Sequence, residues 1–312
     1  MEFTPQFMLF AYTHQLRLGM KIKIPILTED EVQLSATLSR AENARAVVLI
    51  NPGTATKTAF YLPFSEFLQS HGFHVVVWNY RGFDESKTTS LRGCDYRYSD
   101  IGYYDIPAVI DAVKGRFPEL PLYCVGHSAG GQQMGLAHNY HKLDALIAVA
   151  VSAGYFAYMP LMYRIKANFF FRFFAPVTSA LLSYVPAKKF NLMEDLPAGF
   201  AQEWATWCRE KQLFFADKFY GKSIPEGAYK NFDIPTFVIT ADDDEICTER
   251  NVANFWQHVT SKHPITFKHY KSSEFPAKAI GHFGYFRKQN MPIWLDILHI
   301  INELENGRTS HC

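Results

Sequence analysis

Short apolar runs alternate with longer amphipathic stretches along most of the chain, a pattern typical of an α/β sheet. The runs predict an opening antiparallel pair and then buried strands, at Lys21–Ile26, Val32–Leu38, Ala46–Ile50, Phe73–Trp78, Leu122–Val125, Ala145–Val151, Pro235–Thr240 and Ile265–Tyr270. The amphipathic stretches predict helices at Ala59–Ser70, Ile101–Arg116, Gly131–His141, Glu249–Val259 and Met291–Glu305.

One interval breaks this alternation. Between Ser152 and Pro235 lie ~80 residues without a convincing strand, far more than a plain crossover needs. We therefore expect residues 153–229 to form an inserted helical subdomain. It holds 19 of the chain's 49 aromatic residues. They fit either a small core of the insertion or, for about a third of them, an apolar wall that binds an acyl group.

Two further segments bear on membranes. Residues 145–163 contain no charge, but Gly154 and Pro160 interrupt them and their first half suits a buried strand, so we expect no membrane span. Residues 1–19 are expected to be an N-terminal extension or a leader upstream of a natural start at Met20, because the apolar patch at residues 7–11 is too short for a signal-peptide core.

Composition and charge narrow the possible functions. The chain of 312 residues is 48% hydrophobic and 20% charged, with a formal net charge of +1, which gives no broad field for nucleic acid. Five scattered cysteines without a C-x-x-C pattern argue against a disulfide framework or a zinc knuckle. The simplest expectation is a cytoplasmic protein with reduced thiols.

The most informative motif is Gly126-His127-Ser128-Ala129-Gly130, which follows a predicted strand and precedes a predicted helix. Glycines on both sides let neighbouring backbone approach a tight, strained turn. A helix N-terminus there favours negative charge at the hydroxyl. We expect Ser128 to be a nucleophile; an ordinary glycine-rich turn is the alternative, and the phosphate-loop patterns do not fit.

A serine nucleophile needs a histidine base, and His282 is the best of twelve candidates. It lies in a glycine-flanked loop after the last predicted strand. His127 is adjacent to the serine, but we expect its side chain to point the other way from the turn.

The base in turn needs a carboxylate, expected at the C-terminal edge of another parallel strand. Asp244 is our first candidate and Asp243 the second, since both directly follow Pro235–Thr240. Three consecutive aspartates also suggest a metal site, but no histidine has ligand spacing, so we expect neither metal nor cofactor. For the oxyanion, the expected donors are the backbone N–H groups of Ala129 and Thr54, since Pro52 has none.

These features resemble the α/β-hydrolase superfamily. The resemblance rests on GHSAG at 126–130, NYRGFDES at 79–86, ADDDEI at 241–246 and GHFGYF at 281–286. The last motif, with Pro197–Cys208, is similar to a poorly characterised bacterial branch of predicted hydrolases related to the serine aminopeptidase (S33) group. The resemblance implies a mostly parallel eight-stranded sheet with helices on both faces, the chain order Ser, Asp, His, and a helical lid over the site. Residues 20–152 and 230–312 would then form the core and residues 153–229 the lid.

The sequence departs from the superfamily pattern at three places outside the three candidate catalytic residues. Asn51-Pro52-Gly53 replaces a frequent His-Gly turn, Asp84 replaces a glycine, and Thr248 replaces a proline.

The leading hypothesis is a serine hydrolase, esterase-like or lipase-like, that cleaves a small ester with an apolar acyl or aryl group through an acyl-enzyme. Amide or peptide hydrolysis and acyl transfer use the same residues and stay open. Aminopeptidase activity would need lid carboxylates to hold an amine, for which Glu194, Asp195 and Glu203 are available. A ligand-binding protein without catalysis is the remaining alternative.

Overall fold

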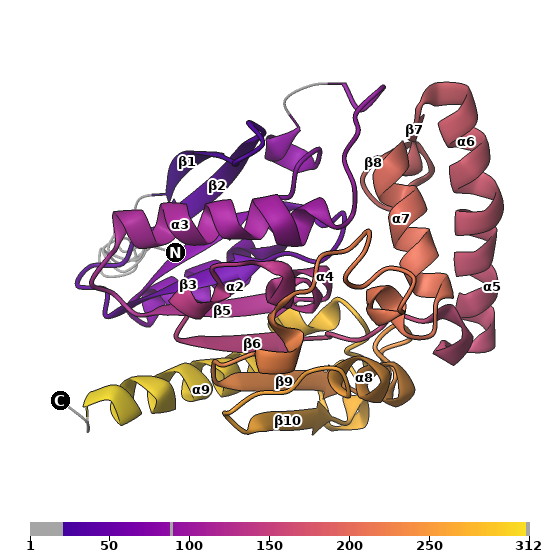
Figure 1. The fold of residues 1–312 in the computed structure, drawn as a ribbon. Coiled ribbons are helices and arrows are strands. Elements are labelled where there is room, and N and C mark those ends of the chain that lie inside the picture. Colours follow the sequence, from indigo (N-terminus) through magenta and orange to yellow (C-terminus); the bar gives the residue numbers. More distant parts are fainter. Residues whose placement is uncertain (1–20, 88–89, 310–312) are drawn as a thin grey trace, which may run out of the picture.

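The computed structural model describes residues 21–87 and 90–309, and an eight-stranded sheet lies at its centre (Figure 1). Its strands are β1 (Lys21–Leu27), β2 (Gln33–Ser39), β3 (Ala46–Asn51), β4 (Phe73–Trp78), β5 (Leu122–His127), β6 (Ala145–Val149), β9 (Thr236–Ala241) and β10 (Ile265–Tyr270). The spatial order is β1-β2-β4-β3-β5-β6-β9-β10, and only the β1–β2 and β2–β4 pairs are antiparallel. The predicted fold class is confirmed.

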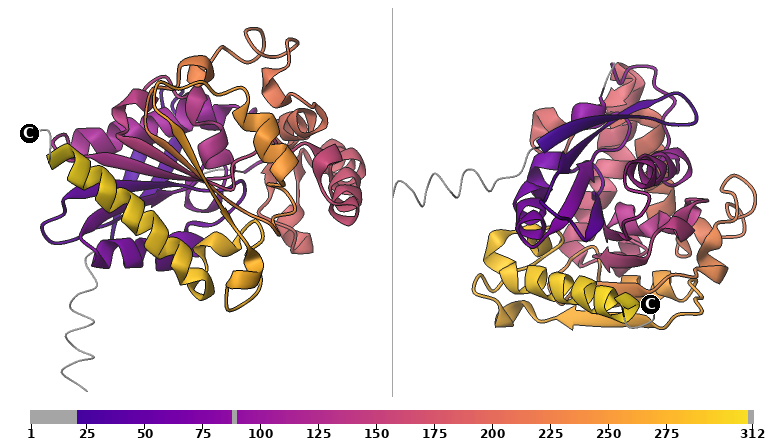
Figure 2. Two further views of the ribbon diagram at one scale, coloured as in Figure 1. Left: turned by 90° about the horizontal axis from the view of Figure 1, so that it is seen from below. Right: turned by 90° about the vertical axis from the view of Figure 1, so that its left-hand side faces the viewer.

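Helices cover both faces of this sheet. One apolar cluster packs α2 (Thr58–Ser70) and α9 (Met291–Thr309) on one face, and a second packs α3 (Ile106–Arg116) and α8 (Glu249–Trp256) on the other (Figure 2). All residues of the four central strands β3, β4, β5 and β6 are buried. Strands buried on both faces explain the continuous apolar runs that made them predictable.

The helix predicted at Gly131–His141 is wrong in start and length. Instead, a single turn, α4 (Ala129–Gln132), begins directly after Ser128, and two 3₁₀ turns follow. Glycines 130, 131 and 135 weaken helix propensity. At Gly135 the backbone also lies so close to the ring of Tyr229 that a Cβ would be 2.5 Å from it.

The segment 153–229 leaves the sheet after β6 and returns at β9. It contains α5 (Leu161–Phe169), α6 (Ala175–Leu182) and α7 (Ala198–Arg209), together with two strands that the sequence did not predict, β7 (Tyr184–Val185) and β8 (Leu196–Pro197). A π turn, Phe170–Phe174, joins α5 to α6. In Figure 1 these two helices form the outermost layer, with α7 between them and the sheet.

The uncharged residues 145–163 are not one helix, because β6 occupies their first five positions and α5 begins at Leu161. Among the described residues, no helix combines the length and apolar character needed to cross a bilayer. The expected extension at residues 1–19 lies outside the described residues.

Candidate active site

Ser128 occupies the turn between β5 and α4 in a strained backbone conformation. Its φ is 51° and its ψ −117°, in a region that residues with a side chain rarely adopt. Its backbone N–H donates to the carbonyl of Val149 on the neighbouring strand (2.9 Å), which holds the turn against the sheet.

Glycines make this turn sterically possible. A Cβ on Gly126 would lie 2.7 Å from the Cα of Gly131, and a Cβ on Gly130 would lie 2.6 Å from the carbonyl oxygen of Asn51. Both distances are too short for side-chain carbon. The close approach expected from the motif is therefore present in the fold.

Ser128, His282 and Asp244 form one hydrogen-bonded row. The Nε2 atom of His282 is 3.0 Å from the Oγ atom of Ser128, and its Nδ1 atom is 3.0 and 2.9 Å from the two carboxylate oxygens of Asp244. The three residues come from the β5 turn, the loop before α9 and the loop after β9. Such a row can pass the hydroxyl proton to the imidazole during an attack by the serine oxygen.

Asp244 is buried yet remains a favourable site for negative charge. Burial alone would raise its pKa. The charge and hydrogen bond of His282 and the backbone N–H groups of Cys247 and Ile246 outweigh that effect, so the pKa of Asp244 lies below its ordinary value. The hydroxyl of Tyr285 also donates to this carboxylate (3.3 Å).

The three consecutive aspartates have separate partners. Asp243 accepts from the backbone N–H groups of Ile280 and Gly281 (2.8 and 2.9 Å), just before His282 in the chain. Asp242 accepts from the backbone N–H of Ser272. The structure thus places Asp244 against the histidine and Asp243 against the backbone of the histidine loop. Across residues 21–87 and 90–309, no three His, Cys, Asp or Glu side chains are grouped as metal ligands.

His127 contacts the histidine loop, which the sequence did not indicate. Its ring is fully buried; Nε2 is 2.8 Å from the carbonyl oxygen of His282, and Nδ1 is 2.6 Å from the hydroxyl of Tyr61. Burial, with the nearby charge of His282, lowers the pKa of His127 to about 3, so the ring is neutral at pH 7.

Its tautomer follows from these contacts. A carbonyl oxygen only accepts, so Nε2 carries the hydrogen and Nδ1 accepts from Tyr61. The Tyr61 oxygen in turn accepts from the backbone N–H of Gly53 (2.7 Å). One chain of hydrogen bonds therefore links the turn after β3, helix α2, the serine turn and the histidine loop.

A largely apolar pocket of about 680 Å³ opens onto Ser128 and His282. From the insertion it is lined by five aromatic residues and several aliphatic ones, the aromatic set being Phe156, Tyr163, Phe170, Phe171 and Trp204. Five of 19 is about a quarter, somewhat fewer than the third expected to face a pocket. Glu194 is the one carboxylate side chain among the described residues that line it.

The two expected oxyanion donors, Thr54 and Ala129, have different relations to the pocket. Thr54 lines the pocket with Ser128, and Ala129 is the residue after the serine. Neither backbone N–H donates a hydrogen bond to another described residue. The hydroxyl oxygen of Thr54 is 3.1 Å from that of Tyr98, so the side chain of Thr54 has a hydrogen-bond partner of its own.

Each departure from the superfamily pattern has a local role. Asn51 donates to the carbonyl of Gly130 (3.2 Å) and accepts from the indole N–H of Trp78 (2.8 Å). Asp84 takes a φ of 44°, the left-handed region where a glycine is common, and its carboxylate accepts from the backbone N–H of Thr58. Thr248 is the N-cap of α8.

Sheet order, strained serine turn and covering helices together define an α/β hydrolase. Residues 42–206 match the model of the family described as serine aminopeptidase, S33, which is more than half of the chain, so the protein belongs to this family. The predicted resemblance is confirmed. No curated protein is similar enough to this chain to give a match.

Several solved structures share the fold at low sequence identity. An α/β serine hydrolase without lid from Xanthomonas campestris is 14% identical, with 91% of this chain and 94% of that chain covered and a TM-score of 0.52. An esterase from Exiguobacterium antarcticum is 14% identical, with 90% and 100% covered and a TM-score of 0.61. An esterase from Pyrococcus furiosus is 16% identical, with 97% and 95% covered and a TM-score of 0.60. At these identities the likeness supports the fold alone.

Proposed function

We propose that the protein is a serine hydrolase that cleaves small esters with an apolar acyl or aryl group through a Ser128–His282–Asp244 triad. The observation that carries this proposal is the hydrogen-bonded row from Ser128 to Asp244 at the floor of a largely apolar pocket.

The reaction would proceed in two halves. Ser128 Oγ attacks the ester carbonyl carbon while His282 Nε2 takes its proton and Asp244 stabilises the resulting imidazolium. The backbone N–H groups of Ala129 and Thr54 receive the negative oxygen. One such donor contributes about 3–4 kcal/mol to the transition state. Collapse breaks the bond to the alcohol, which leaves with the proton from His282, and an acyl-enzyme forms.

Water completes the second half. His282 takes a proton from the water as its oxygen attacks the acyl carbon, and then returns the proton to Ser128 Oγ as the acid is released. No group beyond the chain's own residues is required for this sequence.

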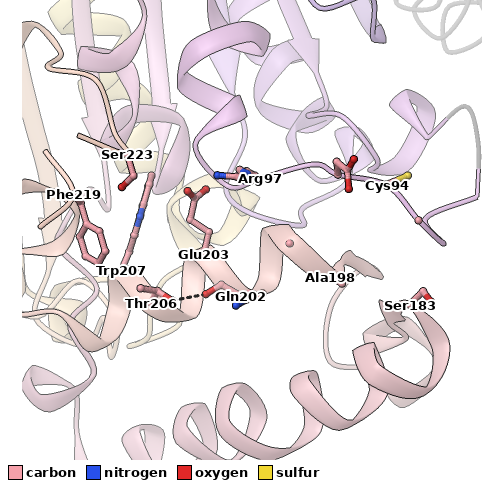
Figure 3. A pocket seen from close by; sticks show the side chains of 13 residues that line it. Cys94, Arg97, Ser183, Ala198, Gln202, Glu203, Thr206, Trp207, Phe219 and Ser223 are labelled. Atoms are coloured by element: carbon pink, nitrogen blue, oxygen red, sulfur yellow. Dashed lines mark hydrogen bonds between the residues drawn. The ribbon is translucent and has the colours of Figure 1, made fainter. Parts of the chain in front are cut away.

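The carboxylates of the insertion favour an ester over a peptide N-terminus. Glu194 already lies 3.3 Å from the Nζ of Lys57 and 3.4 Å from that of Lys188. Glu203 accepts from the backbone and hydroxyl of Ser99, and it lines a different pocket, shown in Figure 3. Asp195 accepts from the backbone of Lys188. A substrate amine would have to displace these partners, whereas an apolar acyl group meets an apolar wall.

We also propose residues 153–229 as a lid on a core of residues 20–152 and 230–312. The Lys57–Glu194 ion pair spans the two parts at the pocket mouth. If the segment opens, Lys57→Ala should increase the rate of fluorophosphonate labelling of Ser128 about twofold, since a partly exposed ion pair contributes only about 1 kcal/mol. An unchanged rate would favour a fixed cap.

The test of the main proposal uses a fluorophosphonate and two substrate panels. Wild-type protein should gain one adduct and hydrolyse p-nitrophenyl esters of graded acyl length, while Ser128→Ala does neither. Aminoacyl-coumarins should be cleaved far more slowly than the esters; faster cleavage would favour the aminopeptidase alternative. If folded wild-type protein gains no adduct while a control hydrolase is labelled, the proposed triad is contradicted. A ligand-binding protein without catalysis would then be the remaining alternative.

The cytoplasm is the proposed location. Cys124, Cys208 and Cys247 are buried thiols outside any disulfide, which suits a reducing compartment. Cell fractionation with a periplasmic and a cytoplasmic marker enzyme tests this placement.

A further inference from the structure

The outermost helix of the insertion carries a row of exposed apolar side chains. Every fourth residue from the start of α5 to the end of α6 is apolar, and each is between 52% and 77% exposed, the row being Leu161, Ile165, Phe169, Phe173, Val177 and Leu181. Isolated exposed apolar residues are normal on a protein surface, but a continuous row marks a contact site.

The opposite side of the same helix packs against the rest of the protein. Phe170 and Phe171 are buried and line the pocket above Ser128, and Ala175 is buried near α7. Figures 1 and 2 show that this helix forms the outer edge of the molecule beside α7, with no other described element beyond it. The exposed row therefore faces away from the fold and cannot be covered by the described core.

The π turn keeps the row together. In an α-helix of about 3.6 residues per turn, a step of four residues overshoots one turn, so a row drifts around the axis. A π turn has more residues per turn, and Phe170–Phe174 lies midway along the row. It reduces the drift between Phe169 and Phe173, whose rings lie 6.2 Å apart.

Charge around the row is strongly one-sided. Residues 153–193 contain no aspartate or glutamate but five cations, Arg164, Lys166, Arg172, Lys188 and Lys189, in a chain whose charges otherwise nearly balance. Among them, Lys188 alone forms an ion pair with a described residue, Glu194. Lys166, Arg172 and Lys189 are exposed.

The exposed apolar row and the surrounding positive charge together indicate what kind of partner binds this helix. A second copy of the chain, packed row against row, would bring like charges together, and a neutral apolar partner would leave four of the five cations without an ion pair to a described residue. An anionic lipid surface satisfies both, because the apolar side chains enter the acyl boundary while lysine and arginine meet phosphate headgroups. We propose that the α5–α6 helix docks the protein on a bilayer rich in anionic phospholipid. The proposal goes beyond the hydrolase function and does not depend on it.

The test is co-sedimentation of the full chain with vesicles. Vesicles of equal parts phosphatidylglycerol and phosphatidylcholine should bind wild-type protein about tenfold more tightly than vesicles of phosphatidylcholine alone. The triple variant Phe173→Ser, Val177→Ser, Leu181→Ser should lose about tenfold in this affinity. None of these residues lines the active-site pocket, so hydrolysis of a water-soluble ester should be unchanged.

Matched controls separate the helix from general hydrophobicity and from charge. Leu27→Ser with Phe267→Ser removes equally exposed apolar side chains from β1 and β10 and should leave binding unchanged. Arg172→Glu with Lys189→Glu should weaken binding to the anionic vesicles by about tenfold, with no loss on neutral ones.

Three outcomes would overturn the proposal: no binding by wild-type protein, equal binding by the triple variant, or a wild-type dimer that the triple variant dissolves. The last would identify a second copy as the partner. Ser128→Ala should bind vesicles like wild type, so failure of the hydrolase proposal and failure of this one remain distinguishable.

Discussion

The Nε2 atom of His127 lies 2.8 Å from the backbone carbonyl oxygen of His282, although 155 residues separate them in the chain. The residue beside the serine thus holds the loop that carries the imidazole facing that serine. On its other side, His127 accepts from Tyr61, whose oxygen also receives the backbone N–H of Gly53. We infer that His127 and Tyr61 are positioning residues for the reaction.

Tyr61→Phe tests this positioning role. The change leaves the Gly53 N–H and the His127 Nδ1 without partners in a buried site, which costs about 1–3 kcal/mol of stability. Because His127 then holds the His282 loop less firmly, kcat for an activated ester should fall about tenfold, or about 1.4 kcal/mol, with KM little changed.

Tyr123→Phe is the matched control, since Tyr123 is also buried and its hydroxyl donates to Glu305, far from the pocket. It should lower stability without changing kcat. Equal kcat in both variants would show that the Tyr61 contact has only a structural role.

The buried neutral state of His127 predicts how stability depends on pH. Its pKa is about 3 in the folded protein, against about 6.5 for an unfolded histidine. Between these values the unfolded chain binds the additional proton, so stability is fully present above about pH 6.5 and is lost as the pH falls towards 3. Between about pH 6.5 and about pH 5, the titration of His127 lowers the free energy of unfolding of the wild-type protein by about 2 kcal/mol.

Urea unfolding of wild type and His127→Asn at these two pH values measures the effect. The variant is less stable at the higher pH but should lose about 2 kcal/mol less on acidification. Asp244 does not interfere, because its lowered pKa places its own loss of stability below its ordinary value of 3.8. Parallel losses in the two proteins would contradict the prediction.

Asp244 and Asp243 are adjacent, yet their replacement should have different effects. Asp244→Asn removes the charge that orients His282 and stabilises its protonated form, and kcat should fall about a thousandfold or more. Asp243→Asn keeps one oxygen for the two backbone N–H groups of the histidine loop, so kcat should fall about tenfold at most. Steady-state kinetics of both variants with one activated ester measures these losses in kcat. A larger loss in Asp243→Asn than in Asp244→Asn would identify Asp243 as the acid of the triad.

The glycine pattern of the serine turn makes a prediction about stability. In Gly130→Ala the new Cβ would meet the backbone of Asn51 at 2.6 Å, where only a shift of β3 or α4 relieves the clash. We expect a loss of about 3 kcal/mol in urea unfolding. Gly115→Ala is the control: it is exposed in α3 with no atom within 4 Å of the new Cβ, and should stabilise by about 0.5–1 kcal/mol.

The sheet was predictable because its central strands are apolar on both faces. The predicted range of β4 agrees fully with the structure, whereas β5 extends two residues further than expected, to His127. Gly126 suggested the end of the strand, but it lies within the strand. A glycine is needed at this position because a Cβ would lie 2.7 Å from the Cα of Gly131. A glycine can mark either a turn or a close approach of two backbone segments, and a sequence alone does not distinguish the two.

The candidate triad could be proposed from local motifs, since each member follows a recognisable strand. Tyr61 could not. It lies in an amphipathic helix, where a buried tyrosine is indistinguishable from an ordinary core residue, and its partner is 66 residues away. His127 is part of the serine motif, but its contact with the carbonyl of His282 depends on the three-dimensional path of the His282 loop, which the sequence does not give.

The aromatic wall of the pocket predicts which esters the proposed hydrolase prefers. Ala167 in α5 lines the pocket and is half-buried, so Ala167→Phe places a ring in the space available to an acyl chain. For a p-nitrophenyl octanoate, kcat/KM should fall about tenfold or more, since each excluded methylene contributes about 1 kcal/mol of binding. For the acetate, kcat/KM and the rate of fluorophosphonate labelling should stay unchanged, because the triad is untouched. Ala180→Phe, on an exposed position of α6, is the matched control and should alter neither ester. A uniform loss for both esters in Ala167→Phe would mean that the acyl chain lies elsewhere, and that this wall serves only to pack the helix onto the core.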